Sequence, residues 1–561
     1  MNSRPFKPTC FIFTILATVM MSPAASPAQT GTSGQAAPPA LTTREWEDDL
    51  DTLVERIPRY HGNAFHAASK PEFEEAVRSL RSGIGTMNED QILVGFARLI
   101  GMLQDGHNHI DLSRGTDRHE GYPLRVGWYP EGIYVEKAAP GVAALAGGKL
   151  VAIEGHPIDS VLQQIIPLLP HDPGNLPNGL TQLSQYLLDS HILHGLGVTP
   201  TASRARFTVD KSGKNVVVEV HTSVFSRRSY YFPPPPDWVD ARPAGDQRPL
   251  AWRHPDSTFW LAFLTDQKTV YAQVNGVANG PDESLADFAK RVTRNVRENQ
   301  ARRVILDLRW NDGGNNYLLK PLIVSLIQMT QIDERGHLFV LTGPTTFSAA
   351  QNFVNRLENF TEAIFVGEPT GENVNFYGDT RGFDLPHSRC GVFLANLWWQ
   401  DKDPRDRRTA TFPEIAEEIT FSDYMQGSDP AVEYILTHEK IPTIEDLLTE
   451  ALERHGYAGA AGAFRAFRSD PVHKYMDDAT LEGRVNNLGY ALISRNKLDD
   501  AIAILKVNTE EYPGSFNTWD SLGEAYADAG RKEEAIAAYR KSLELNPTSR
   551  TGLDALKKLQ P

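Results

Sequence analysis

A serine stands where its hydroxyl could act as a nucleophile. Residues 338–350 run through an apolar strand and a Gly-Pro turn to Ser348, which is predicted to begin a helix. The positive end of the helix dipole and the amide of Ala349 would then face the hydroxyl, as an oxyanion hole does in acyl transfer. Serine and threonine are also common helix N-caps, so a purely structural role is open for Thr345, Thr346 or Ser348.

A second segment could bind a ligand at the same sheet edge. Residues 304–314 form a buried-type strand that ends in the Gly313-Gly314 turn, where backbone N–H groups are free to point at a ligand. In open α/β sheets, sites form at the carboxyl ends of the strands. Both segments therefore mark the same edge as a candidate site.

The elements around these two segments predict a largely parallel sheet with helical crossovers, because strands alternate with helices of about 10 to 15 residues. Apolar patterning and turn residues predict strands at 270–274, 303–308, 337–341 and 363–366, and helices at 283–299, 317–329 and 347–358. Apolar residues at helical spacing predict a small helical unit from Thr43 to Leu103, with Asp90 as an N-cap. Short strands between Tyr122 and His221 predict a compact, partly open barrel.

The C-terminal part contains an internal repeat of 34 residues. Leu488-Gly489 recurs as Leu522-Gly523, and Ala501-Ile502 recurs as Ala535-Ile536. This period and these residue types resemble the tetratricopeptide repeat, an all-α structure in which helix pairs stack. Because two units are fewer than a stable stack usually needs, the helical stretch 443–468 is expected to complete or cap them.

Composition and charge narrow the function classes. The chain has 561 residues, 41% of them hydrophobic, with 56 Lys and Arg against 71 Asp and Glu and a net charge of −15. This length suggests three or four folding units, and the negative charge argues against nucleic acid as the main partner. Two cysteines are too few for a disulfide scaffold or a Cys-rich zinc module.

The first residues are typical of a secretory signal peptide. Arg4 and Lys7 precede an apolar run, and a stretch of small residues ends at Ala28, the expected cleavage point. The run is shorter than the roughly 20 residues that span a bilayer, so membrane association is expected only if the leader is not cleaved. We therefore predict a periplasmic or extracellular protein, in which loss of Cys10 would leave Cys390 alone.

Three motifs in order resemble those of tail-specific, or C-terminal-processing, serine proteases. Residues 307–314 (DLRWNDGG) resemble their Asp-Leu-Arg-x-Asn-x-Gly-Gly element, residues 346–350 (TFSAA) their nucleophile motif, and residues 366–371 (VGEPTG) their Val-Gly-Glu-x-Thr-x-Gly element. The resemblance covers roughly residues 43–437. It implies an α/β core of the crotonase-like type, with an N-terminal helical unit, a PDZ-like β domain and, here, an all-α tetratricopeptide tail.

The resemblance also assigns domains along the chain. The PDZ-like segment lacks a clear Gly-Leu-Gly-Phe carboxylate loop, which puts the capture of peptide C-termini in doubt. The expected parts are a signal peptide at 1–28, a flexible tether at 29–39, the helical unit at 40–118, the PDZ-like domain with a helical insertion at 119–225, a Pro-rich linker at 226–254, the catalytic core at 255–442, a helical connector at 443–479 and two tetratricopeptide repeats at 480–550.

The family uses either a lysine after the serine or, in tricorn-like members, a histidine before the PDZ-like domain as the general base. Glu372 and Asn373 occupy the expected lysine positions, whereas His107 stands where the histidine variant places its base. Histidine suits this role because its ordinary pKa is about 6.5. A turn histidine bonded to backbone, or one half of a metal pair with His109, is the alternative, but no third ligand is recognisable at any spacing. Asp105 and Glu368 are the candidates for the carboxylate that orients His107.

The expected function is thus a serine-type peptidase that acts on polypeptides and needs no cofactor or metal. Ser348 would attack the peptide carbonyl, His107 would transfer the proton, and the amides of Gly313 or Gly314 and of Ala349 would hold the oxyanion. Two alternatives stay open, a catalytically inactive scaffold that binds peptides or hydrophobic ligands, and serine chemistry on non-peptide esters or amides. The repeat tail is expected to recruit a protein partner.

Overall fold

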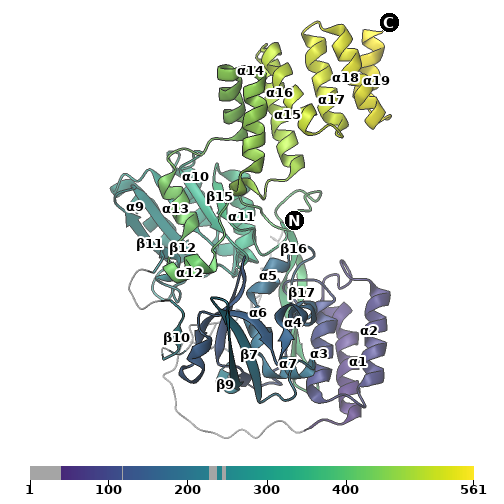
Figure 1. Ribbon diagram of the computed structural model, residues 1–561, viewed down its shortest axis with the longest axis vertical. Coiled ribbons are helices and arrows are strands. Elements are labelled where there is room, and N and C mark those ends of the chain that lie inside the picture. Colours follow the sequence, from purple (N-terminus) through teal and green to yellow (C-terminus); the bar gives the residue numbers. More distant parts are fainter. Residues whose placement is uncertain (1–39, 117, 227–234, 236, 243–247, 561) are drawn as a thin grey trace, which may run out of the picture. The chain divides into compact units, whose positions relative to one another are not determined.

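The computed structural model describes residues 40–116, 118–226, 235, 237–242 and 248–560 (Figure 1). The described residues from Leu41 onward form one compact unit. The predicted leader at 1–28, the tether at 29–39 and part of the Pro-rich linker lie outside the described residues.

The N-terminal helical unit contains three helices, and each begins at a side-chain N-cap. Asn88 caps the third helix in a reciprocal capping box with Gln91, so the prediction of Asp90 as the cap is wrong by two residues. Asp90 lies in the first turn and contacts His191 and His194 at 2.8 and 2.6 Å. The three helices are α1 (Thr43–Tyr60), α2 (Lys70–Gly83) and α3 (Glu89–Gly101).

These helices share their hydrophobic core with a hairpin that comes from far along the chain. Strands β16 (Asn375–Asp384) and β17 (Gly391–Gln400) pair antiparallel, and β1 (His109–Asp111) joins β17. Residues of the hairpin region, including Leu385, Cys390 and Leu394, are fully buried in one cluster with Leu50 and Phe96 of the helices. The hairpin therefore packs with the helical unit although its sequence lies within the 255–442 segment.

The β domain that follows is built on a seven-stranded sheet and has a hydrophobic core of its own. The central strands run in the order β10-β4-β5-β7-β8, with β3 on β4 and β6 on β5. Its strands are β3 (Leu124–Tyr129), β4 (Gly132–Ala138), β5 (Lys149–Ile153), β6 (His156–Pro157), β7 (Arg204–Lys211), β8 (Lys214–His221) and β10 (Val239–Asp240), and β2 (Arg118–Gly121) pairs with β9 (Ser223–Ser226). Its helices are η1 (Pro140–Leu145), α4 (Ile158–Ile165), η2 (Ile166–Leu168), α5 (Leu176–Thr181), α6 (Leu183–Leu188) and α7 (Ser190–Gly195).

The α/β core is a six-stranded sheet in the order β11-β12-β13-β14-β15-β18. Every pair is parallel except β11 with β12, as strands that alternate with helices require. The strands are β11 (Phe259–Leu264), β12 (Thr269–Val274), β13 (Arg303–Asp307), β14 (Leu338–Thr342), β15 (Ile364–Gly367) and β18 (Ile415–Ala416). The helices are η3 (Leu250–Trp252), α9 (Leu285–Glu298), η4 (Asn316–Leu318), α10 (Lys320–Gln328), α11 (Ala349–Phe360), α12 (Phe421–Gln426) and α13 (Pro430–Thr437).

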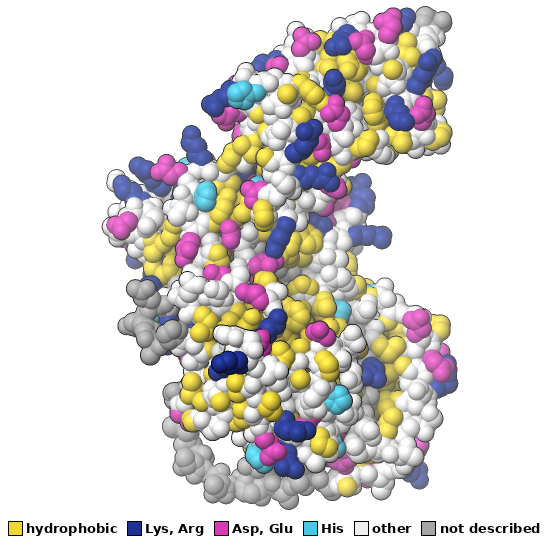
Figure 2. All heavy atoms as spheres, viewed as in Figure 1, with side chains coloured by type: hydrophobic (Ala, Val, Ile, Leu, Met, Phe, Trp, Pro, Cys, Tyr) yellow, Lys and Arg dark blue, Asp and Glu magenta, His cyan; other side chains and the backbone are white. Residues whose placement is uncertain are grey.

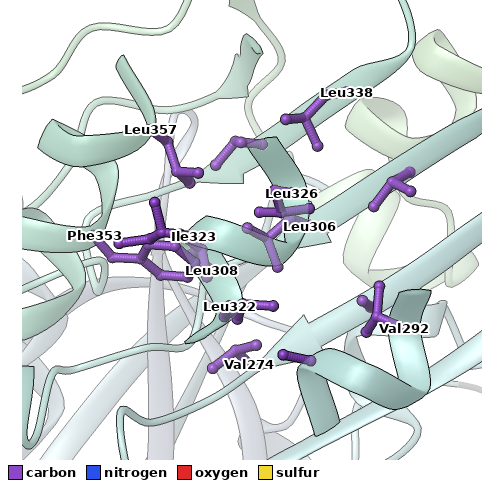
Figure 3. Close-up of a cluster of buried hydrophobic side chains, with 14 of the residues drawn as sticks. Val274, Val292, Leu306, Leu308, Leu322, Ile323, Leu326, Leu338, Phe353 and Leu357 are labelled. Atoms are coloured by element: carbon purple, nitrogen blue, oxygen red, sulfur yellow. The ribbon is translucent and has the colours of Figure 1, made fainter. Parts of the chain in front are cut away.

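One face of this sheet is buried under helices α9, α10 and α11. Leu306 and Val274 of the strands pack with Val292, Leu322 and Phe353 of the helices in a closely packed apolar cluster (Figure 3). Such a core gives the strand ends a rigid base from which the following loops can place side chains. Each strand and helix that the sequence predicted in this region is present, with ends shifted by at most a few residues.

The C-terminal part consists of helices, as predicted. The break at Gly456 (φ 64°) interrupts α14, whose apolar residues share a core with α15 and α16. The following helix pairs, α15 with α16 and α17 with α18, lie where the sequence predicts the two repeats, and Figure 1 shows them stacked with α19. Their bounds are α14 (Ile444–Ser469), η5 (Pro471–His473), α15 (Asp478–Ser494), α16 (Leu498–Glu511), α17 (Phe516–Asp528), α18 (Lys532–Leu545) and α19 (Arg550–Leu559).

Charged side chains of both signs are interspersed over the face that Figure 2 shows. The net charge of −15 is therefore not gathered into one acidic patch on that face. Within the described part of the chain, none of the helices combines the length and the apolar character needed to cross a bilayer.

Candidate active site

Ser348 occupies a strained turn between strand β14 and helix α11. Its backbone has φ 55° and ψ −125°, in the left-handed region that a residue with a Cβ rarely adopts. Such conformations cost about 1–3 kcal/mol and are held by their surroundings, commonly at functional sites. Although Ser348 stands at the N-cap position, its side chain makes no capping hydrogen bond. The Ser348 hydroxyl therefore does not cap helix α11, although its position would suggest that role.

The loop after β13 and the loop after β14 are hydrogen-bonded to each other beside this serine. Thr346 Oγ1 donates to the carbonyl of Leu308 at 2.9 Å, and the Phe347 amide donates to the carbonyl of Asn311 at 3.0 Å. The Thr346 hydroxyl therefore bonds to the β13 loop and does not cap helix α11. These bonds fix the nucleophile loop against the loop that carries the two glycines.

Gly313 lies directly against Ser348. A Cβ at Gly313 would lie 2.6 Å from Ser348 Cβ and 3.1 Å from the Ala349 nitrogen, so no other residue fits without displacing the serine. Gly313 (φ 113°) and Gly314 (φ 130°) both have positive φ values. The amide of Gly313 donates to Asn311 Oδ1 at 3.0 Å, which engages one of the three predicted oxyanion donors within its own turn.

His107 meets Ser348 although 241 residues separate them in sequence. Its Nε2 lies 3.0 Å from Ser348 Oγ, within hydrogen-bond distance. The ring stacks on Phe347 with centroids 4.5 Å apart, and Phe376 lies parallel to it at 5.9 Å. These aromatic neighbours restrict the imidazole to an orientation in which one nitrogen faces the hydroxyl.

The carboxylate at the other ring nitrogen belongs to Glu372, which sequence reasoning did not select. Glu372 Oε1 lies 3.3 Å from His107 Nδ1, and Oε2 accepts the Ser348 backbone N–H at 2.5 Å. The Glu372 side chain is completely buried. Ser348, His107 and Glu372 therefore form a contiguous chain of nucleophile, imidazole and carboxylate.

Burial and charge shift both titrating groups of this pair. Burial disfavours the imidazolium, but the Glu372 carboxylate, aided by Asp105 and Asp172, raises the pKa of His107 to about 9. Burial raises the pKa of Glu372 to about 8, although the charge of His107 opposes this shift.

Asp105, one of the two predicted orienting carboxylates, bonds to the backbone of the loop that carries His107. Its Oδ1 accepts the His107 amide at 2.9 Å, and its Oδ2 lies 3.1 Å from His61 Nε2. Asn63 N donates to His61 Nδ1 at 2.9 Å, so the imidazole carries its proton on Nε2 and donates it to Asp105. His66 completes a group with metal-ligand geometry, but a metal on His61 Nε2 would have to displace this proton.

Glu368, the other predicted orienting carboxylate, lies close to different charges. Burial and the nearby Glu418 raise the pKa of Glu368 to about 7, against the opposing charge of Arg309. Glu372 is the carboxylate at the imidazole in place of both candidates. The sequence marks Glu372 only through its position. It stands where the members of the family that use a lysine as the general base would carry that lysine.

Arg309 anchors the end of strand β13 below the site. Its guanidinium donates to Asp307 and, through Nη1 and Nη2, to Asp429 at 2.9 and 2.7 Å. All three side chains are at least nine-tenths buried. This buried ion-pair network explains why the Asp-Leu-Arg element follows the strand, since it fixes the loop that leads to Gly313.

Comparison with known proteins supports the fold and the repeat. The tetratricopeptide repeat model matches residues 516–549, which confirms the predicted repeat in that part of the tail. No curated protein sequence matches the chain. The solved structure of mature CPAF complexed with lactacystin matches with a TM-score of 0.50 and 13% identity, covering 70% of this chain and 97% of that one. About 70% of the chain therefore shares the fold of CPAF.

Two other solved structures match more loosely. The photosystem II D1 C-terminal processing protease has a TM-score of 0.33 at 15% identity and covers 70% of this chain and 99% of its own. The tricorn protease has a TM-score of 0.33 at 14% identity, with 70% of this chain and 36% of its own covered. Scores this low do not establish a common fold.

Proposed function

We propose that the chain is a serine-type peptidase that hydrolyses peptide bonds through an acyl-enzyme on Ser348. The observation that carries this proposal is the 3.0 Å separation between His107 Nε2 and Ser348 Oγ, two side chains from distant parts of the sequence. A serine hydroxyl is a weak nucleophile unless a base takes its proton, and this distance allows the transfer. The resemblance of residues 307–314, 346–350 and 366–371 to motifs of tail-specific proteases supports peptides as the substrate class.

In the proposed reaction, Ser348 Oγ attacks the carbonyl carbon while its proton moves to His107 Nε2. The tetrahedral intermediate expels the amine, which takes that proton as it leaves. Water then attacks the ester by the same route and restores the serine. Glu372 orients the ring and stabilises the imidazolium that forms in each half of the reaction, in place of Asp105 and Glu368.

The oxyanion would be held by backbone amides next to the nucleophile. Because the Gly313 amide donates to Asn311, we assign the hole to the amides of Gly314 and Ala349. Each such donor contributes roughly 3–4 kcal/mol to the stabilisation of a transition state. The glycine at position 313 contributes by allowing the close approach to Ser348.

The wider organisation extends the proposal. The domain at 119–225 is PDZ-like and would present substrate to the α/β core, which we propose is of the crotonase-like type. The enzyme is exported by its leader to the periplasm or the medium, and the repeat tail recruits a protein partner. N-terminal sequencing of the exported protein, with residue 29 expected first, tests the leader.

The test of the chemistry is labelling with a fluorophosphonate, which modifies an activated serine. The wild-type protein is expected to be labelled on Ser348, as mapped by mass spectrometry, whereas Ser348→Ala and His107→Ala should not be. Ser422→Ala, a change at an exposed serine whose hydroxyl accepts a hydrogen bond from Gln426 of the same helix, is the matched control and should label normally. Absence of labelling in folded wild-type protein would instead support a binding scaffold, and comparison of casein, short peptides and simple esters separates peptidase from esterase activity.

A further inference from the structure

A short polar segment of the β domain reaches the candidate active site. Residues 172–178, here called the bridging segment, connect η2 to helix α5 and include the first residues of α5. Their polar side chains are almost completely buried, with Asp172, Asn175 and Asn178 only 3%, 2% and 5% exposed. Buried polar side chains are normally retained only where they make specific hydrogen bonds.

Asp172 joins the two loops on either side of the imidazole. Its Oδ1 accepts the Gly106 amide at 2.9 Å, and its Oδ2 accepts the Asn373 amide at 3.1 Å. Gly106 directly precedes His107, and Asn373 directly follows Glu372. One carboxylate therefore sets the separation between the loop of the base and the loop of its orienting carboxylate.

Asn175 and Asn178 extend these contacts to the other loops of the site. Asn175 occupies the N-cap position of α5 but makes no capping bond, and its Nδ2 donates instead to the carbonyls of Thr370 and Thr409 at 3.0 and 2.7 Å. Asn178 Nδ2 donates at 3.0 Å to the carbonyl of Pro344, four residues before Ser348. The Asn175 side chain thus bonds to the α/β core and does not cap its own helix.

The fit between the segment and the core leaves no room for a side chain at position 371. A Cβ on Gly371 would lie 2.0 Å from the Pro344 carbonyl oxygen and 2.7 Å from Asn178 Nδ2. The loop before Ser348, the loop before Glu372 and the bridging segment therefore meet at one tightly packed point. A shift of the segment would be transmitted to both loops.

We propose that the bridging segment positions the catalytic loops, and that Asp172 is a positioning residue that holds His107 and Glu372 in contact. This rests on the proposed function of the three site residues. Asp172 acts through the backbone of its neighbours and has no contact with reacting atoms. The β domain thereby completes the active site of the core, in addition to any role in presenting substrate.

Asp172 also adds negative charge beside the base, which gives its role a measurable signature. The titratable groups that face it are Asp105, His107 and Glu372, and His171 Nδ1 bonds its backbone carbonyl. Burial and the charge of Asp105 raise the pKa of Asp172 to about 6. Its charge in turn contributes to the raised pKa of His107, so neutralising it should lower that pKa.

The test compares Asp172→Asn with Asp189→Asn in the full chain. Asp172→Asn keeps the size of the side chain but turns an N–H donor toward one of the two backbone amides. We expect kcat to fall about 10- to 100-fold with KM changed less than about twofold, because misplacing reacting groups by an ångström can cost a hundredfold in rate. The acid limb of the pH profile should move to lower pH.

The control and a second measurement separate positioning from folding. Asp189 caps helix α7 in the same β domain and is as deeply buried, so Asp189→Asn should leave kcat and the pH profile unchanged. Hydrogen exchange should rise in peptides covering 104–109 and 370–375 in Asp172→Asn only. If Asp172→Asn does not fold, Asn178→Ala tests the bridging segment at the loop before Ser348, where slower fluorophosphonate labelling of Ser348 is expected.

If folded Asp172→Asn has the kcat, the pH profile and the hydrogen exchange of the wild-type protein, the proposal is wrong. An equal loss of kcat in Asp189→Asn would also overturn it. Failure of the proposed function gives a different result. In that case the wild-type protein would not be labelled at Ser348, while the exchange protection of the two loops would still respond to Asp172→Asn.

Discussion

One carboxylate oxygen of Glu372 accepts the backbone N–H of Ser348, while its other oxygen lies 3.3 Å from Nδ1 of His107. A single buried side chain thus contacts both the residue that supplies the nucleophile and the ring that would activate it. The contact to the Ser348 amide also helps to hold that residue at φ 55°. Orientation of the base and strain at the nucleophile are therefore linked through Glu372.

Glu372→Gln should lower kcat by roughly 10²- to 10⁴-fold, by analogy with the loss of the orienting carboxylate in a serine protease triad. The amide oxygen can still accept from Ser348 N, but the NH₂ group then donates to His107 Nδ1 and places the ring proton on Nε2, where it blocks proton uptake from Ser348. Glu368→Gln, a change at the other glutamate of the same loop, is the control and should keep more than about half of the activity. Steady-state hydrolysis of a peptide substrate measures both, and equal losses would contradict the role of Glu372.

Activity should increase with pH from neutral toward about 9. His107 can accept the Ser348 proton only when its ring is neutral, and the adjacent carboxylates raise its pKa to about 9. Below that pH the imidazolium predominates and the rate falls as the pH decreases. A pH profile of kcat/KM checks this, and an acid limb at or below the ordinary histidine value of 6.5 would show that the carboxylates do not raise the pKa of His107 in the free enzyme.

Much of the fold could be predicted from the sequence because it depends on local periodicity. The strands of the α/β core alternate with amphipathic helices, and the 34-residue repeat identifies the tail. Ser348 stood out for a local reason, since it follows a strand and a Gly-Pro turn. Its pairing with His107 was expected only from the family resemblance.

Glu372 and the bridging segment could not be found in this way. Nothing in the residues around Glu372 shows that its side chain contacts Ser348, because this contact joins two loops that are 24 residues apart in the sequence. Asp172 and Asn175 resemble ordinary loop and N-cap residues, and only the three-dimensional structure shows that they bond to another domain. The start of α3 shows a smaller limit, since Asn88 caps the helix two residues before the predicted Asp90.

Arg309→Met should destabilise the α/β core by about 3–5 kcal/mol, because it leaves the carboxylates of Asp307 and Asp429 buried without their partner. Urea unfolding followed by fluorescence measures the change. Arg405→Met alters an arginine that is largely exposed to solvent and should leave the midpoint of unfolding unchanged. An Arg309 variant as stable as the Arg405 variant would show that the buried network contributes little.

Cys390 should resist alkylation in the folded protein. Burial raises the pKa of its thiol to about 12, and its side chain lies in the core shared by the N-terminal helices and the β16–β17 hairpin. Iodoacetamide should therefore modify the peptide that contains Cys390 only after denaturant is added, and treatment of the native protein should not reduce activity. Rapid modification of Cys390 without denaturant, read by mass spectrometry, would show that this core opens readily.

The shared core of helices α1–α3 and the β16–β17 hairpin has a consequence for biosynthesis. A ribosome completes the helices early, but the apolar residues that cover them, among them Leu385 and Leu394, are made almost 300 residues later. The base-bearing part of the chain must therefore wait, with exposed apolar surface, until most of the polypeptide has been translated. The proposed active site therefore cannot be complete in a nascent chain before residue 394 of the 561 residues has been added.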